Sequence, residues 1–164
     1  MLPEFILYSD FACPFCYALE EHLGTLPGGA RIVWRGVQPD AEPDAMMDVE
    51  DLPRATDLAH EVALVQRSWP DLPIVVPKRK PDTRDAIRAT AVFSLIDDFR
   101  AQAFRQTCYR ACWCDGLDLS DRLVLRTLAE RVGLARTALE LLDHPHITET
   151  VALWKRQWEE SGVR

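Results

Sequence analysis

The segment "SDFACPFCYALE" (residues 9–20) carries two cysteines, Cys13 and Cys16, with a Pro-Phe pair between them. A near-continuous apolar run over residues 4–10 leads into this segment. Such a run is typical of a strand buried on both faces, as in a parallel sheet. Pro14 suits the first position of a helix, where its missing N–H costs nothing. The segment therefore predicts a strand that leads directly into a helix, with Cys13 at the junction.

The rest of the chain extends this unit. The stretch "RIVWRGVQ" (residues 31–38) predicts a second strand, so that strand, helix and strand form one βαβ unit with a right-handed crossover. Residues 39–53 contain three prolines and six acids and predict an exposed loop. From about residue 54 the apolar spacing is helical almost to the end of the chain. We therefore expect an α/β protein dominated by helices.

Composition and charge narrow the functional classes. The 164 residues are 48% hydrophobic and 27% charged, which fits one globular core with room for an inserted subdomain. The net charge of −7 disfavours nucleic acids and anionic membranes as partners. No segment has the pattern of a signal peptide or a membrane span, so we expect a cytoplasmic protein.

The two cysteines of the first segment are compatible with three roles. In the cytoplasm, a close pair more often exchanges electrons or holds a metal than forms a structural disulfide. Half a zinc site has the same spacing, and a purely structural pair is the third alternative. The position between a strand and a helix favours redox chemistry, so we expect no metal here.

The position of the two cysteines at the start of the helix also predicts a different role for each thiol. At the start of a helix, unpaired N–H groups and the positive end of the dipole stabilise a thiolate and lower its pKa from about 8.5. This favours Cys13 as the nucleophile. Cys16 lies about one turn further on, where it can attack a mixed disulfide on Cys13, so we expect it to be the resolving thiol.

The other three cysteines, Cys108, Cys112 and Cys114, give a weaker signal. On a helix, Cys108 and Cys112 share a face with Cβ atoms about 5–6 Å apart, too far for a disulfide. Cys114 points to another side of the helix, and no histidine lies nearby to complete a metal site. We expect these cysteines to be buried small hydrophobic residues.

Several stretches resemble one known family. "FILYSDFACPFCY" resembles the opening of the DsbA-like branch of the thioredoxin superfamily, particularly its cytoplasmic FrnE-type members. "RIVWRGVQ" is similar to the second strand of that branch, and "KPDTRDAIRAT" and "YRACWCDGLDLSD" are similar to parts of its helical subdomain. The resemblance implies a thioredoxin-like βαβ half over residues 1–40, a loop over 41–53, an inserted helical subdomain over 54–145, and a helix over 146–164 that returns to the thioredoxin-like part.

The resemblance also implies an activity and site residues. It implies a protein disulfide oxidoreductase in which Cys13 attacks disulfides of proteins or small molecules and Cys16 resolves the intermediate. Phe11, Pro14 and Phe15 would shape the exposed rim that meets the substrate, and Asp10 is a weaker candidate for tuning the cysteines. No bound cofactor is implied, and glutathione is a candidate co-substrate.

The end of the sequence departs from the family pattern. In the family, the helix equivalent to residues 147–161 leads to a cis-proline loop that faces the cysteines, followed by further strands and a helix. Here "SGVR" (residues 161–164) stands where that loop would begin. We therefore expect a two-stranded sheet with exposed apolar surface, which a continuation past Arg164, a second copy of the chain or another partner would cover.

Two alternative functions stay open at this stage. A glutathione-dependent isomerase of the 2-hydroxychromene-2-carboxylate type has the same architecture, although such relatives commonly carry serine at the position of Cys13. A non-catalytic binding module on a thioredoxin fold is the second alternative, because the cis-proline segment lies outside the sequence.

Overall fold

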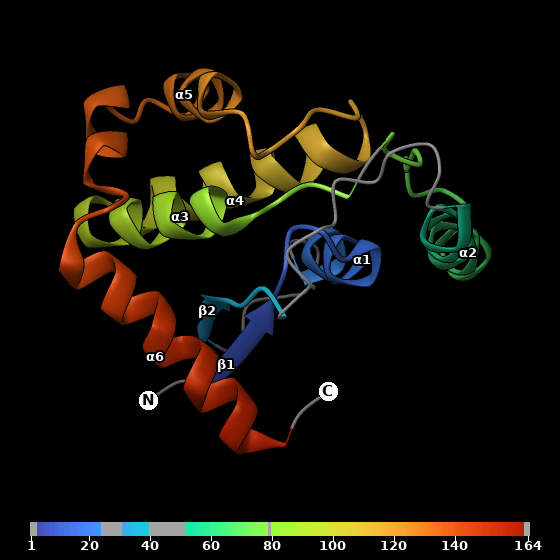
Figure 1. The fold of residues 1–164 in the computed structure, drawn as a ribbon, viewed down its shortest axis with the longest axis horizontal. Coiled ribbons are helices and arrows are strands. Elements are labelled where there is room, and N and C mark those ends of the chain that lie inside the picture. Colours follow the sequence, from blue (N-terminus) through green and yellow to red (C-terminus); the bar gives the residue numbers. More distant parts are fainter. Residues whose placement is uncertain (1–2, 24–30, 40–51, 79, 163–164) are drawn as a thin grey trace.

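The computed structural model describes residues 3–23, 31–39, 52–78 and 80–162 of the chain. The loop expected over residues 41–53 lies almost entirely outside the described residues. The described part contains a small parallel sheet with helices on both sides of it (Figure 1). The division into four segments stays a prediction.

The predicted βαβ unit is confirmed. Strand β1 (Glu4–Ser9) leads into helix α1 (Pro14–Leu23), and strand β2 (Arg31–Gly36) returns alongside β1. The two strands are parallel, with Glu4 opposite Arg31 and Ser9 opposite Gly36. Parallel pairing places the end of β1 next to the end of β2, so the segment after Ser9 lies at the carboxyl edge of the sheet.

The burial of β1 corrects one expectation from the sequence. Phe5 is 56% exposed and Ile6 is 47% exposed, so the first half of the strand is not buried on both faces. The reason is that the described sheet contains only two strands, so the side chains of β1 have a neighbouring strand on one flank only. Ile32 on β2 is also exposed, which confirms the expected apolar surface on a two-stranded sheet.

Most of the described chain after β2 is helical. The helices are α2 (Leu52–Ser68), α3 (Arg84–Ile96), α4 (Asp98–Trp113), α5 (Arg122–Arg131), a short 3₁₀ helix (Arg136–Leu141) and α6 (Pro145–Ser161). Helices α3 and α4 pack side by side and form a layer next to α1, with α5 on the other side of that layer (Figure 1). None of the described helices combines the length and apolar character that a bilayer span requires.

The largest core lies around α3 and α4. Phe93 and Phe104 meet edge to face with ring centroids 4.8 Å apart, and both side chains are fully buried. Gly36 at the end of β2 is needed for the approach of α3, because a Cβ there would lie 2.6 Å from a methyl carbon of Ile87. The sheet and the helical layer are therefore packed against each other at the carboxyl ends of the strands.

Helix α6 runs beside the sheet, on the side away from α1 (Figure 1). It packs against β2 and α3, and Arg35 of β2 donates a hydrogen bond of 2.5 Å to Gln157 of α6. His144 begins the helix, where its Nδ1 accepts a hydrogen bond from the N–H of His146. The long last helix thus ties the helical part back to the strands.

Candidate active site

The two cysteines lie where β1 gives way to α1. The chain turns after Ser9, and the N–H of Cys13 donates to the carbonyl of Asp10 at 3.2 Å. Cys13 then caps α1, since the N–H of Tyr17 donates to its carbonyl at 3.1 Å. Pro14 is the first residue of the helix, as its fixed backbone predicts. The local sequence therefore places Cys13 at the positive end of the helix.

Cys13 and Cys16 are linked by a hydrogen bond in the first turn of α1. The N–H of Cys16 donates to the Cys13 sulfur at 3.4 Å, in the way that an N-cap side chain accepts from the first turn. Both side chains are half-buried, so the structure does not distinguish an exposed thiol from a covered one. Both cysteines are therefore partly accessible to a substrate.

The two thiols shift each other's pKa in opposite directions. The hydrogen bond between the thiols lowers the pKa of Cys16 to about 6, because the neutral Cys13 thiol then donates to the Cys16 thiolate. The same bond raises the pKa of Cys13, because a second thiolate beside the first is unfavourable. With the proton on Cys16 instead, the thiolate sits on Cys13, where the N–H groups of Phe15 and Cys16 stabilise it. These shifts correct the expectation from the sequence, because the lowered pKa belongs to Cys16 and the pKa of Cys13 is raised.

Asp10 lies directly behind this loop. Its Oδ1 accepts hydrogen bonds from the N–H of Ala12 at 3.1 Å and from the hydroxyl of Thr83 at 2.6 Å. Burial raises the pKa of the Asp10 carboxyl, and the two hydrogen bonds offset only part of that effect. Thr83 precedes α3, so Asp10 links the cysteine loop to the helical part of the molecule.

Two further hydrogen bonds hold the same loop. The hydroxyls of Ser9 and Tyr109 are 2.5 Å apart, and the indole Nε1 of Trp113 donates to the carbonyl of Phe11 at 2.8 Å. All four side chains are buried. With the bond between Asp10 and Thr83, there are three such contacts. They hold three consecutive residues before the cysteines, each through one residue of the helical part. We call these three contacts the loop clasp; they are Ser9–Tyr109, Asp10–Thr83 and Phe11–Trp113.

Sequence reasoning did not identify the residues of α4 that contact the first βαβ unit. Arg105, Tyr109 and Trp113 recur every four residues and therefore share one face of the helix. Arg105 donates to the Glu20 carboxylate of α1 at 2.8 Å and forms a largely buried ion pair. The signal in the sequence was a repeat of large side chains with polar ends, which can reach across a helix interface.

The rim predicted from the sequence is corrected by the structure. Phe11 is fully buried between the rings of Trp34 and Tyr109, with centroids 5.3 and 4.7 Å away, so it cannot lie on an exposed rim. Pro14 is also buried, because the first turn of α1 packs inward. Only Phe15 of the three is exposed, at 42%.

The three later cysteines occupy two kinds of environment. Cys108 and Cys112 are fully buried in α4, which confirms their expected role as small hydrophobic residues. Cys114 is only half-buried, in contrast to the expectation. Its sulfur contacts the hydroxyl of Tyr17 at 3.1 Å and the carbonyl of Pro73 at 3.4 Å.

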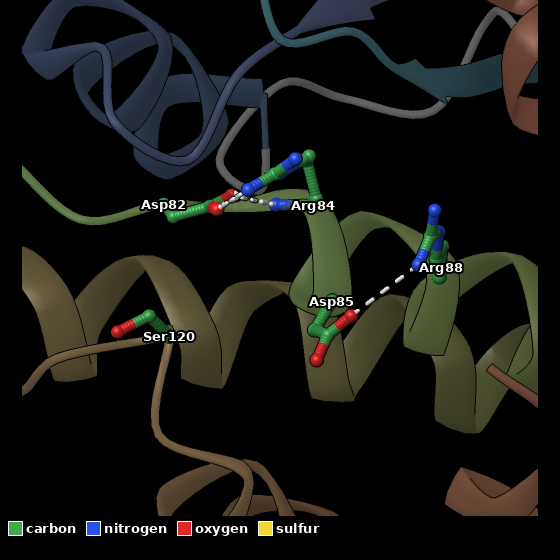
Figure 2. Close-up of a pocket in the computed structure, with 5 residues that line it drawn as sticks. All are labelled: Asp82, Arg84, Asp85, Arg88 and Ser120. Carbon is green, nitrogen blue, oxygen red and sulfur yellow. Dashed lines mark hydrogen bonds and ion pairs between the residues drawn. The ribbon is translucent and has the colours of Figure 1, made fainter. Parts of the chain in front are cut away.

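A polar pocket of about 280 Å³ lies beside the start of α3 (Figure 2). Its charged side chains pair with one another: Arg84 with Asp82, and Arg88 with Asp85. Ser120 lines the pocket from the loop before α5. The charges of these four side chains therefore balance within the pocket.

The comparisons with known proteins agree with this geometry. A family model described as "DSBA-like thioredoxin domain" matches residues 4–164. A putative protein disulfide isomerase from Nitrosomonas europaea has a TM-score of 0.76 and 17% identity, with 100% of this chain and 81% of that chain covered. No curated protein matches by sequence.

Two other similar solved structures are named for different activities. The 2-hydroxychromene-2-carboxylate isomerase has a TM-score of 0.75 and 20% identity, covering 98% of this chain and 81% of that one. The cytosolic disulfide reductase DsbM from Pseudomonas aeruginosa, solved with GSH, has a TM-score of 0.70 and 17% identity, covering 97% of this chain and 81% of that one. At such identities the likeness establishes the thioredoxin-like DsbA fold alone.

Proposed function

Because the chain belongs to the DSBA-like thioredoxin domain family, we propose that it is a thiol–disulfide oxidoreductase whose redox pair is Cys13 and Cys16. The observation that carries the proposal is the position of the pair at the start of α1, where the Cys13 sulfur accepts a hydrogen bond from the backbone N–H of Cys16. The lowered pKa of Cys16 also supports the proposal, because a thiolate is the reactive form in disulfide exchange.

The proposed reaction has two exchange steps. The Cys13 thiolate attacks one sulfur of a substrate disulfide, forms a mixed disulfide and releases the other substrate sulfur as a thiolate. The Cys16 thiolate then attacks the Cys13 sulfur and releases the remaining substrate thiolate. The substrate gains two electrons and, once its thiolates are protonated, two protons; the pair becomes a disulfide. The reverse sequence oxidises a dithiol substrate.

Three neighbouring features complete the proposal. Phe15 offers an exposed ring next to both cysteines for an apolar part of the substrate. Asp10, whose buried carboxyl has a raised pKa, tunes the pair electrostatically. Glutathione is the proposed co-substrate that recycles the pair, supported by the GSH that is bound to the related DsbM structure. The substrates are protein or small-molecule disulfides, and the proposed location is the cytoplasm.

The test combines a redox equilibrium with single substitutions. The protein is equilibrated with mixtures of reduced and oxidised glutathione, quenched with acid, and its thiols are alkylated and counted by mass spectrometry. We expect a Cys13–Cys16 disulfide that forms and breaks reversibly, and loss of disulfide reductase activity to background in Cys13→Ser. Cys114→Ser is the matched control, since its half-buried thiol lies outside the pair. Full activity in Cys13→Ser would reject the proposal.

The isomerase function is the second candidate, favoured by the structural likeness to 2-hydroxychromene-2-carboxylate isomerase. An isomerase needs one glutathione-binding site but no disulfide cycle, so the two candidates respond differently to loss of Cys16. We expect Cys16→Ser to lose disulfide turnover. Conversion of 2-hydroxychromene-2-carboxylate with glutathione, undiminished in Cys16→Ser, would replace the first candidate by the second.

A further inference from the structure

Thr83 stands at the N-cap position of α3, but its side chain does not cap that helix. A threonine at this position ordinarily accepts a hydrogen bond from a backbone N–H of the first turn. Here the first N–H of the helix, that of Arg84, donates to Oδ1 of Asp82 at 3.0 Å instead. The hydroxyl of Thr83 is therefore left for a contact outside its own helix.

That contact is with Asp10. The Thr83 hydroxyl donates to Oδ1 of Asp10 at 2.6 Å, across a separation of 73 residues in sequence. Thr83 is fully buried and Asp10 is 8% exposed, so water competes little with this bond. Removing the donor leaves the buried acceptor without that partner. The bond therefore fixes the carboxyl group of Asp10 against the start of α3.

Asp10 begins the turn that brings Cys13 to the start of α1. Its backbone carbonyl accepts the N–H of Cys13 at 3.2 Å, which closes a four-residue turn from Asp10 to Cys13. Its Oδ1 accepts the N–H of Ala12 at 3.1 Å within the same turn. The backbone and the side chain of Asp10 thus both hold the turn.

The turn in turn sets the position of the Cys13 sulfur. The N–H of Tyr17 donates to the carbonyl of Cys13, and the N–H of Cys16 donates to its sulfur at 3.4 Å. Both bonds require Cys13 to keep its orientation at the helix start, where backbone N–H groups stabilise a thiolate. Observed hydrogen bonds therefore lead from the Thr83 hydroxyl through the Asp10 turn to the sulfur of Cys13.

We propose that Thr83 is a positioning residue for the attacking thiol: by holding the carboxyl group of Asp10, its hydroxyl fixes the turn that orients Cys13. The inference rests on the proposed function, in which Cys13 attacks the substrate disulfide. It gives the helical part of the molecule a role in the rate of that attack.

The first test measures the attack alone, in a Cys16→Ser parent. The Cys13 thiolate and oxidised glutathione give one mixed disulfide on Cys13 and one glutathione thiolate, and mass spectrometry follows the adduct with time. Thr83→Val keeps the shape of the side chain but removes the donor, so we expect the rate to fall about threefold. Thr83→Ser keeps the donor and should retain the rate of the parent.

The matched control is Thr90→Val in the same parent. Thr90 also belongs to α3 and is 2% exposed, but its hydroxyl donates to the carbonyl of Ala86 within the helix at 2.9 Å. Its loss removes a buried hydroxyl from the same helix without touching the turn, so the rate should not change. Thr83→Ala, which removes the same donor and leaves a smaller side chain, replaces Thr83→Val if that variant does not fold.

A further background separates positioning from charge. The bond from Thr83 lowers the pKa of Asp10, so Thr83→Val also favours the neutral carboxyl. Loss of that negative charge would favour a thiolate on Cys13 and speed the attack, opposite to the expected change. Asp10→Asn keeps an acceptor oxygen without the charge, and in this background Thr83→Val should again slow the attack about threefold.

The outcomes distinguish the inference from the proposed function. An unchanged or faster attack in Thr83→Val, an equal loss in Thr90→Val, or no effect of Thr83→Val in the Asp10→Asn background overturns the positioning role of Thr83. No adduct at Cys13 in the Cys16→Ser parent itself would instead reject the proposed function, on which the inference rests.

Discussion

Strand β1 joins two regions with opposite surroundings. At its start, Phe5 and Ile6 lie largely in solvent on a two-stranded sheet, whereas the loop after Ser9 is covered by α3 and α4 and fixed by three buried hydrogen bonds. Strand pairing does not explain the difference, since it is regular along the whole of β1, where every residue from Glu4 to Ser9 has a partner on β2. The difference indicates that the cysteines are positioned by the helical part of the molecule more than by the sheet.

The strongest test of this comparison uses two phenylalanines, one from each region. Phe11→Ala should lower the free energy of unfolding by about 3–5 kcal/mol, because it empties a fully buried site between Trp34 and Tyr109. Phe5→Ala, at a residue that is 56% exposed, should change it by no more than about 0.5 kcal/mol. Urea unfolding of both variants measures the difference. Equal losses would show that the sheet surface contributes as much as the loop region.

The next test concerns the two ion pairs between α1 and α4. Arg105→Ala leaves the buried Glu20 carboxylate without its partner and should destabilise the fold by about 3 kcal/mol. Arg110→Ala breaks the pair with Glu21, in which the arginine side chain is 64% exposed, and should cost less than about 1 kcal/mol. Thermal unfolding of the two variants side by side checks this ranking. Similar losses would mean that burial does not separate the two pairs.

A third test depends on the sign of a pH effect. The folded state raises the pKa of Asp10, so wild type loses stability as pH rises through that pKa and Asp10 ionises. Asp10→Asn keeps an acceptor oxygen for Thr83 without the charge, and should therefore gain stability relative to wild type as pH rises above the usual carboxyl pKa of 3.8. Urea unfolding at a series of pH values measures this gain.

The matched variant of that experiment is Asp82→Asn. Arg84 lowers the pKa of Asp82, so the pair stabilises wild type above the usual carboxyl pKa of 3.8 and the stabilisation is lost as pH falls. Asp82→Asn should lose stability relative to wild type as pH rises, by less than about 1 kcal/mol because the pair is exposed. The same sign in both variants would contradict the assigned environments.

The smallest effect on stability is expected at the exposed ring beside the cysteines. Phe15→Ala should leave the free energy of unfolding within about 0.5 kcal/mol of wild type. It should lower kcat/KM for a peptide disulfide by about threefold, because the substrate loses an apolar contact of about 0.7 kcal/mol. Steady-state kinetics at low substrate concentration measure the ratio. Unchanged kinetics would remove Phe15 from the proposed substrate contacts.

The sequence predicted what local patterns control. The apolar run of β1, Pro14 at the start of α1 and the helical spacing around Phe93 each depend on neighbouring residues, and the structure has the strands and helices that they predict. The position of Cys13 at the helix start follows from the same local signals.

The residues that the sequence did not reveal act over long distances in the chain. Thr83, Tyr109 and Trp113 reach the cysteine loop from 73, 100 and 102 residues away, and no local pattern records such a pairing. The burial of Phe11 follows from those contacts, which is why its predicted place on the rim was wrong. The exposure of Phe5 depends on how many strands lie beside β1, which is a property of the whole sheet and not of the residues next to Phe5 in sequence.

The most direct test of the account is to trap the first exchange step. Cys16→Ser is incubated with oxidised glutathione at neutral pH, digested without reduction and mapped by mass spectrometry. The account predicts one glutathione, attached at Cys13, and no such adduct after the same treatment of a Cys13→Ser/Cys16→Ser variant. No adduct at Cys13, or an adduct at Cys114 that forms equally fast, would contradict the assignment of Cys13 as the attacking thiol.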